Sequence, residues 1–324
     1  ARYQIDPLGQ RRGFSGDNLV CYVSIESHYS VLMAANVLGI GFDNVIKIPC
    51  DESGRMRIDK LQEEIERTRT NGQTPFCVIA TSGTTVRGAF DPIKEIAEIC
   101  SDNDIWLHVD AAWGGSCMFS TKHRDLMNGV ELADSVCWDA HKMMGVPLVC
   151  SAFLIKKPEI LRKVCSHGDV AHYLFHGDSE DIDIGRISLQ CGRRNDALKL
   201  FLAWREKGDA GWARLVDSYV DLADYLQSLV EAEGKLEMVS SRVWSNVCMR
   251  YVVDGFDLND VNFQIRERMM REGRFMVSSS NVGGFVILRP VIANPAVTRD
   301  VLNRFVENAI QIGDDIVRGL PSTI

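Results

Sequence analysis

Residues 106–115 read WLHVDAAWGG, a short apolar run that ends in Asp110 and continues into small residues. The apolar residues predict a buried strand, and the alanines and glycines that follow predict a turn. In open α/β sheets, ligands bind beyond the carboxyl ends of the strands. Asp110 is therefore a candidate site residue, although an aspartate that only caps the following turn would produce the same pattern.

On both sides of this segment, strand patterns alternate with helical patterns over the first two thirds of the chain. The predicted strands cover residues 18–24, 45–49, 76–80, 106–110, 135–138 and 149–155. The predicted helices cover residues 29–38, 59–69 and 92–100. This alternation predicts an α/β fold whose mostly parallel sheet is covered by helices on both faces.

The pattern changes near residue 198. A long helical stretch covers residues 198–230, and two predicted strands (247–253 and 285–288) and two predicted helices (261–272 and 299–317) follow it. These elements predict a smaller C-terminal α+β domain. The expected division is a large domain over residues 1–200 and a small domain over residues 201–324.

The composition excludes several kinds of partner. With 36 basic and 44 acidic residues the net charge is −8, and neither nucleic acid nor an anionic membrane attracts an acidic surface. The longest apolar stretch, residues 146–155, is too short to span a bilayer, and no signal peptide is visible. A small-molecule ligand is the partner that this composition favours.

Ten cysteines are spread over the chain without a CxxC pair or metal-ligand spacing. Most stand inside apolar runs, as Cys77 does in PFCVIA and Cys150 does in PLVCSAFLI. Buried reduced thiols are therefore expected, which favours a cytoplasmic protein and no metal site.

Lys142 lies in DAHKMMG, between a predicted strand and an apolar run. Burial there would lower its pKa and leave a neutral amine that can bond to a carbonyl carbon. The alternative is a surface lysine at a strand end. His141 beside it could donate to a phosphate or be a half-buried histidine whose hydrogen bonds are made within the protein.

Two further residues are candidates because of their position. His28 stands at a strand-to-helix junction in SIESHYS, where its ring could stack on an aromatic cofactor or merely begin the helix. Arg193 in LQCGRRND offers a planar fork for a carboxylate, or forms a solvated pair with Arg194.

The order and spacing of these segments carry more information than any one of them. SHYS, TSGTTVRGAFDP, WLHVDAAWGG, HKMMGVP and QCGR follow one another along the chain, and an NPA turn stands at residues 294–296. Together they resemble the group II decarboxylases that depend on pyridoxal phosphate (PLP). The branch that they resemble contains glutamate, cysteine-sulfinate and diaminobutyrate decarboxylases.

This resemblance implies a type I fold similar to aspartate aminotransferase, with PLP as the cofactor. It implies an enzyme that decarboxylates an acidic L-amino acid to an amine and CO2, as a homodimer or together with a missing N-terminal fragment. The implied site residues are Lys142 for the covalent link to PLP, Asp110 for the pyridine nitrogen, Ala112 and His28 for the two ring faces, Thr85 for the ring oxygen, His141 for the cofactor, and Arg193 for the substrate α-carboxylate.

The sequence departs from the family pattern in three places. No Gly-Gly-Ser-x-x-Asn phosphate loop precedes His28, so the chain is expected to be incomplete or to need a second polypeptide. Ile182 stands where a catalytic tyrosine is expected, with Tyr173, His172 and His176 as substitutes, and Asp139–Ala140 replaces Asn-Pro. The alternatives are therefore a decarboxylase of diaminobutyrate or another amino acid, a carbonyl-forming PLP enzyme, and an incomplete partner subunit.

Overall fold

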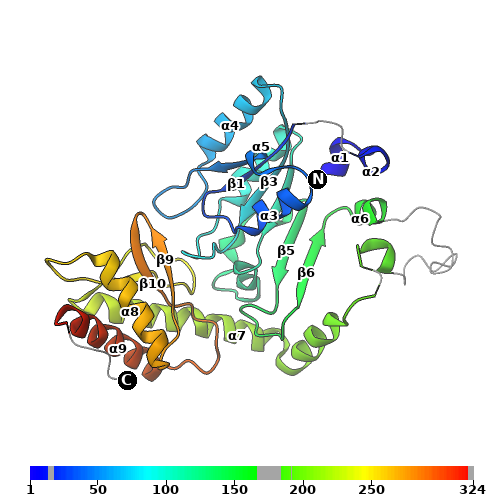
Figure 1. The fold of residues 1–324 in the computed structure, drawn as a ribbon. Coiled ribbons are helices and arrows are strands. Elements are labelled where there is room, and N and C mark those ends of the chain that lie inside the picture. The colour runs from blue at the N-terminus through cyan, green and yellow to red at the C-terminus, as the bar shows by residue number, and fades with distance from the viewer. Residues whose placement is uncertain (14–17, 166–183, 191, 320–324) are drawn as a thin grey trace.

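The structure is a computed structural model that describes residues 1–13, 18–165, 184–190 and 192–319 (Figure 1). Its larger sheet has the strand order β2-β1-β3-β4-β5-β6. The strands are β1 (Leu19–Ser24), β2 (Val45–Ile48), β3 (Thr74–Thr81), β4 (Trp106–Asp110), β5 (Ser135–Asp139) and β6 (Ser151–Ile155). All neighbouring pairs are parallel except β5 and β6, which are antiparallel. The predicted α/β fold with a mostly parallel sheet is thus confirmed.

The two faces of this sheet are covered to different degrees. Helices α4 (Ile58–Thr70) and α5 (Ile93–Asp102) pack closely on one face. On the other face, α3 (Ser30–Val37), α6 (Pro158–Cys165) and Ala1, which precedes α1 (Arg2–Ile5), line a cavity of about 600 Å³. Phe153 of β6 lines this cavity and is 52% exposed. Helices thus lie on both faces of the sheet, as predicted, and the second face retains a cavity.

The C-terminal part of the described chain contains a second sheet with the order β7-β8-β10-β9, whose neighbouring strands are antiparallel. Its strands are β7 (Leu236–Met238), β8 (Met249–Tyr251), β9 (Ser278–Val282) and β10 (Phe285–Arg289). Helices α8 (Leu258–Glu272) and α9 (Arg299–Val317) pack against this sheet. The sequence patterns predicted β8 and β10 but not β7 and β9, because LEM is very short and SSSNV is mostly polar.

Helix α7 (Asp196–Ala232) connects the two sheets, and Gly208 interrupts it with non-helical backbone angles. The expected division between residues 200 and 201 falls inside α7 and stays a prediction. The remaining helices of the described residues are α2 (Gly9–Arg12) and short 3-10 helices at Phe42–Asn44, Gly114–Phe119, Arg124–Met127, Val130–Leu132 and Ile184–Ile187. None of the helices in the described ranges is long and apolar enough to cross a membrane.

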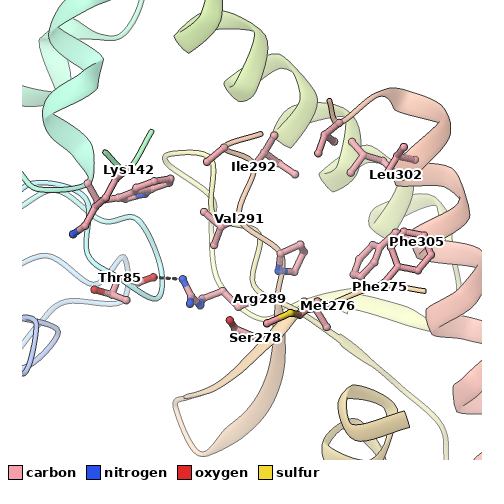
Figure 2. A pocket seen from close by; sticks show the side chains of 16 residues that line it. Thr85, Lys142, Phe275, Met276, Ser278, Arg289, Val291, Ile292, Leu302 and Phe305 are labelled. Atoms are coloured by element: carbon pink, nitrogen blue, oxygen red, sulfur yellow. Dashed lines mark hydrogen bonds between the residues drawn. The ribbon is translucent and has the colours of Figure 1, made fainter. Parts of the chain in front are cut away.

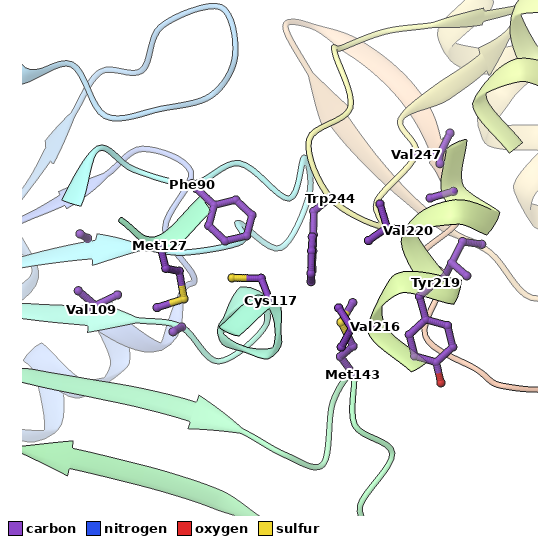
Figure 3. Packing of buried hydrophobic residues seen from close by; sticks show 14 of the residues in the cluster. Phe90, Val109, Cys117, Met127, Met143, Val216, Tyr219, Val220, Trp244 and Val247 are labelled. Carbon is purple, nitrogen blue, oxygen red and sulfur yellow. The ribbon is translucent and has the colours of Figure 1, made fainter. Parts of the chain in front are cut away.

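One apolar core joins the two sheets (Figure 3). Trp244, which precedes β8, is fully buried, and its ring meets the ring of Phe90 edge-on at a centroid distance of 5.8 Å. The same cluster contains Val109 of β4 and Val216 of α7. Because apolar interiors pack as densely as organic crystals, this shared core fixes the small sheet against the carboxyl ends of β3 and β4.

Candidate active site

The turn after β3 carries the two threonines of the GTT motif. Gly83 has φ of 82°, and a Cβ atom there would lie 2.7 Å from the backbone nitrogen of Gly114, so this turn lies directly against the one that follows β4. The hydroxyl oxygen of Thr84 is used inside the turn, where it accepts a hydrogen bond from Ala89 N at 3.0 Å. Thr85 is exposed, and it is therefore the threonine that a ligand can reach.

Asp110 is the last residue of β4, as predicted. Its Oδ1 accepts hydrogen bonds from Ala112 N at 3.1 Å and from the Cys137 thiol at 3.4 Å. Burial and the nearby Asp110 charge raise the pKa of Cys137 to about 12, so the thiol stays protonated and remains a donor. Within the described ranges, no hydrogen bond reaches Oδ2, which leaves one carboxylate oxygen available to a ligand.

The segment after β5 places Lys142 beside Asp139. The Lys142 Nζ lies 3.3 Å from Asp139 Oδ2, and His141 Nε2 lies 3.8 Å from the same oxygen. Asp139 therefore has a cationic partner in Lys142, although it stands where the family pattern has asparagine. The Lys142 side chain is 38% exposed, more than its apolar neighbours suggested, because Met143 and Met144 fill the interior and leave the lysine outside.

His141 is half-buried and already engaged with the backbone. Its Nδ1 lies 2.9 Å from the carbonyl oxygen of Cys150 and 3.1 Å from the nitrogen of the same residue. These contacts close the 141–150 segment onto β6 and support the reading of a histidine whose hydrogen bonds are made within the protein. A contact between His141 and a cofactor phosphate stays a prediction.

A cavity of about 550 Å³ lies where the two sheets meet (Figure 2). Thr85, Trp113 and Lys142 line it from the side of the large sheet. The opposite wall comes from the C-terminal part of the chain, mainly from Phe275–Ser278, from Arg289 to Ala293, and from α9. Its volume falls in the range of ligand pockets, which is roughly 300–1,000 Å³.

Arg289, which ends β10, is the site residue that the sequence patterns missed. Its Nη1 donates to the Thr85 carbonyl oxygen at 2.5 Å, and its Nε is buried without a hydrogen-bond partner among the described residues. Burial lowers the pKa of Arg289, yet an arginine stays protonated in a protein. The positively charged guanidinium of Arg289, whose Nε–H makes no hydrogen bond within the described residues, therefore lies in the cavity wall. A charged residue directly after the apolar run FVIL was the available signal, and it resembles the signal that identified Asp110.

The structure does not bring every predicted residue to this cavity. Asp110 lines the 600 Å³ cavity on the large sheet instead. His28 stays at the end of the loop after β1, where its Nδ1 lies 2.8 Å from Ser30 Oγ. Arg193 is exposed, and its Nη1 donates to Gln190 O at 3.4 Å. Ile182, Tyr173, His172 and His176 lie outside the described residues.

Comparison with known proteins defines the class. A family model described as the pyridoxal-dependent decarboxylase conserved domain matches residues 11–252, well over half of the chain. The chain therefore belongs to the pyridoxal-dependent decarboxylase family, as the order of its sequence segments predicted.

Two individual members of the family are similar to this chain over nearly its whole length. The human acidic amino acid decarboxylase GADL1 is 37% identical over 332 residues, which cover 98% of this chain and 64% of that protein. The crystal structure of mouse CSAD in apo form superposes with a TM-score of 0.91 at 34% identity and covers 97% of this chain and 68% of that one. The chain thus spans less than two thirds of the length of GADL1.

A plant enzyme shows the same fold with a different substrate. Catharanthus roseus tryptophan decarboxylase in complex with L-tryptophan has a TM-score of 0.87 and 26% identity, with 96% of this chain and 66% of that chain covered. The fold alone therefore does not decide between acidic and aromatic amino acids, and the side chains around the cavity must do so.

The described residues fit the cofactor of this family, pyridoxal phosphate. Asp110 ends β4, and Lys142 follows the adjacent parallel strand β5, which ends at Asp139. The Lys142 amine lines the 550 Å³ cavity, the Asp110 carboxylate lines the 600 Å³ cavity, and Asp110 Oδ2 has no protein donor within the described ranges. The pyridine ring of the cofactor needs such an acceptor, and its aldehyde needs such an amine.

Proposed function

We propose that this chain carries the PLP site of an enzyme that decarboxylates an acidic L-amino acid to the corresponding amine and CO2. The observation that carries the proposal is the meeting of Lys142, Thr85 and Arg289 in one cavity. These residues provide an amine for the cofactor and a half-buried cation for a carboxylate. The similarity to the acidic amino acid decarboxylase GADL1 supports the same substrate class.

In this proposal, Lys142 binds the cofactor covalently and Asp110 Oδ2 accepts a hydrogen bond from the ring nitrogen. Ala112 and His28 contact the two ring faces, Thr85 contacts the ring oxygen, and His141 contributes to binding. The bound cofactor supplies an electron sink for the bond that breaks between Cα and the carboxyl carbon. The residues of the chain bind and orient the substrate and hold the proton on the ring nitrogen.

Asp139 and Asp110 have different electrostatic roles in the proposed site. Asp139 lies 3.3 Å from the Lys142 amine and can keep it oriented when it is not bonded to the cofactor. The bonds from Ala112 and Cys137 hold Oδ1 of Asp110, so its Oδ2 keeps a fixed direction. A fixed acceptor needs no reorganisation when charge develops in the reaction, which is the main source of electrostatic catalysis.

The function is tested by incubating the chain with PLP and each of L-glutamate, L-aspartate, L-cysteine sulfinate and L-2,4-diaminobutyrate. The expected product is an amine, detected by mass together with CO2. An aldehyde product would favour the alternative carbonyl-forming PLP enzyme. Binding of PLP without turnover of any amino acid would favour an incomplete subunit.

An acidic substrate has two carboxylates, and we propose that Arg193 and Arg289 each bind one of them. Removing one partner of a charge pair that is buried in the complex costs roughly 2–5 kcal/mol, which corresponds to about two to four orders of magnitude in kcat/KM; because Arg193 is exposed in the free chain, the lower end is expected for it. With Arg193 on the α-carboxylate, Arg193→Ala lowers kcat/KM for acidic and neutral amino acids alike, whereas Arg289→Ala lowers it for acidic ones. The reverse pattern would exchange the two roles.

Arg194→Ala is the control for this comparison, because Arg194 is an exposed neighbour and carries the same charge. Its kcat/KM is expected to stay near that of the wild type. Wild-type activity of Arg289→Ala on an acidic substrate would remove Arg289 from the site, and the same result for Arg193→Ala would remove Arg193.

We also propose that the active species is a homodimer or an assembly with another polypeptide in the cytoplasm. Phe153 and Leu154 are large apolar residues on the edge strand β6, and they are 52% and 59% exposed, which favours their cover by another chain. Free thiols at the cysteines of the described chain suit a reducing compartment. Light scattering during turnover tests the assembly, and an active monomer of 324 residues would contradict it.

A further inference from the structure

The side-chain amide of Asn246 connects the C-terminal part of the chain to the large sheet through both its oxygen and its nitrogen. It precedes β8, is 1% exposed, and accepts a hydrogen bond at Oδ1 from Trp113 Nε1 at 2.8 Å. Its Nδ2 donates to the carbonyl oxygens of Thr85 and Val86, both at 3.0 Å. One buried amide thus holds two loops of the large sheet from the C-terminal side.

Both Thr85 and Trp113 line the 550 Å³ cavity. The carbonyl of Thr85 receives hydrogen bonds from Asn246 and from Arg289, and the carbonyl of Val86 also accepts one from the Cys248 thiol at 3.5 Å. All three donors belong to the C-terminal part of the chain. Hydrogen bonds from the C-terminal part therefore fix Thr85 and Val86, which form the first half of the GTT turn.

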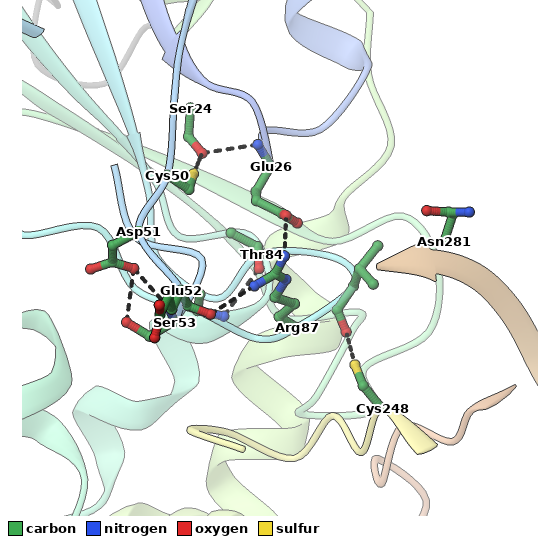
Figure 4. Close-up of polar contacts among 12 residues, drawn as sticks. Ser24, Glu26, Cys50, Asp51, Glu52, Ser53, Thr84, Arg87, Cys248 and Asn281 are labelled. Atoms are coloured by element: carbon green, nitrogen blue, oxygen red, sulfur yellow. Dashed lines mark hydrogen bonds and ion pairs between the residues drawn. The ribbon is translucent and has the colours of Figure 1, made fainter. Parts of the chain in front are cut away.

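The second half of the same turn is anchored elsewhere. Arg87 pairs with Glu26 at 3.3 Å and donates to the carbonyl oxygen of Glu52 at 3.0 Å, so it is fixed to the large sheet (Figure 4). Loss of the Asn246 contacts would therefore loosen Thr85 and Val86, whose carbonyl oxygens keep one hydrogen bond each from Arg289 and Cys248, without releasing the whole turn.

The hydrogen-bond chemistry allows only one orientation of the Asn246 amide. An indole N–H can only donate and a carbonyl oxygen can only accept, so the amide oxygen must face Trp113 and the amide nitrogen must face the turn. The packing is equally tight, because a Cβ atom on Gly88 would lie 3.0 Å from Asn246 Oδ1 and 2.9 Å from Trp244 Cβ. An aspartate at position 246 has the same shape but cannot donate to the turn.

We propose that Asn246 is a positioning residue, which fixes Thr85 and Trp113 and so makes the shape of the cofactor cavity depend on the small C-terminal sheet. The effect on cofactor affinity rests on the proposed function, whereas the effect on the two loops does not. Asn246 contacts neither substrate nor cofactor in this proposal and acts through the loops alone.

Asn262 provides a matched control. It is fully buried, accepts from Tyr251 N at 2.7 Å, and donates to Tyr251 O and Leu258 O at 2.8 Å each. It therefore makes the same number and kind of bonds as Asn246, but it makes them inside the C-terminal part. Asn246→Asp and Asn262→Asp should both lower the melting temperature, so stability alone does not distinguish them.

Hydrogen exchange of the chain without cofactor distinguishes the two variants. The amides of Gly83, Gly88 and Gly114 bond within or between the two loops and report on their order. Asn246→Asp is expected to speed their exchange about tenfold, the factor that corresponds to about one lost hydrogen bond. Asn262→Asp should leave these amides unchanged. Equal exchange at the loops in both variants would overturn the proposal.

A titration with PLP, followed by the change in absorbance, measures the consequence for the site. The Kd for PLP is expected to rise about tenfold in Asn246→Asp and to stay constant in Asn262→Asp. Faster loop exchange with an unchanged Kd would overturn the link to cofactor binding. If the wild-type chain binds no PLP, the proposed function fails, and hydrogen exchange alone still decides whether Asn246 fixes the loops.

Discussion

Lys142→Ala is expected to lower kcat by about three orders of magnitude or more. The variant loses both the amine that bonds to PLP and a group that can transfer protons near Cα, and proton transfer by a positioned side chain alone contributes about two to four orders of magnitude. Steady-state assays measure the loss, and the visible absorption band of bound PLP should disappear with it.

Borohydride reduction of the wild-type holoenzyme, followed by peptide mapping, locates the attachment directly. The pyridoxyl group is expected on the peptide that contains Lys142. Lys60→Ala is the control, because Lys60 lies on α4 and pairs with Glu63 on the surface of that helix. A label on any other lysine would end the assignment of Lys142.

Asp110→Asn is expected to lower kcat by about two to three orders of magnitude, the usual cost of removing one preorganised electrostatic group. The amide oxygen can still accept from Ala112 N and the Cys137 thiol, so the NH2 group must occupy the Oδ2 position. It would then donate toward the ring nitrogen and disfavour the protonated ring. Cofactor binding should change much less than kcat, as measured by a PLP titration.

Asp134→Asn controls for the loss of a carboxylate at the edge of the same strands. Asp134 Oδ2 accepts a hydrogen bond from Leu107 N at 2.9 Å, and this residue lies immediately before β5, at the opposite end from Asp110. The variant retains an acceptor and should keep wild-type kcat. Near-normal turnover of Asp110→Asn would refute the role of Asp110.

The part of the site that follows strand ends was predictable from the sequence. Asp110 and Lys142 stand where local patterns end a strand, and the structure places both at those positions. The local pattern did not reveal whether the Lys142 side chain points into the core or outward. That depends on Met143 and Met144 filling the core, which is a property of the packed molecule.

Residues that connect the large sheet with the C-terminal part were harder to predict. Arg289 follows an apolar strand, but its contact with Thr85 joins positions 204 residues apart. Asn246 gives no local signal, because an asparagine in a loop is ordinary and its partner Trp113 is 133 residues away. Such contacts depend on how two sheets pack, and sequence periodicity does not encode that packing.

The core shared by the two sheets also has a consequence for synthesis on the ribosome. Val109 and Cys117 leave the exit tunnel well before Trp244, which completes the same buried cluster in the finished molecule. Apolar surface of the nascent large sheet therefore stays uncovered during much of translation, and transiently exposed surface of this kind is prone to aggregation. The cavity cannot form until β10 and α9 have emerged, so chaperone binding during elongation would protect the half that is made first.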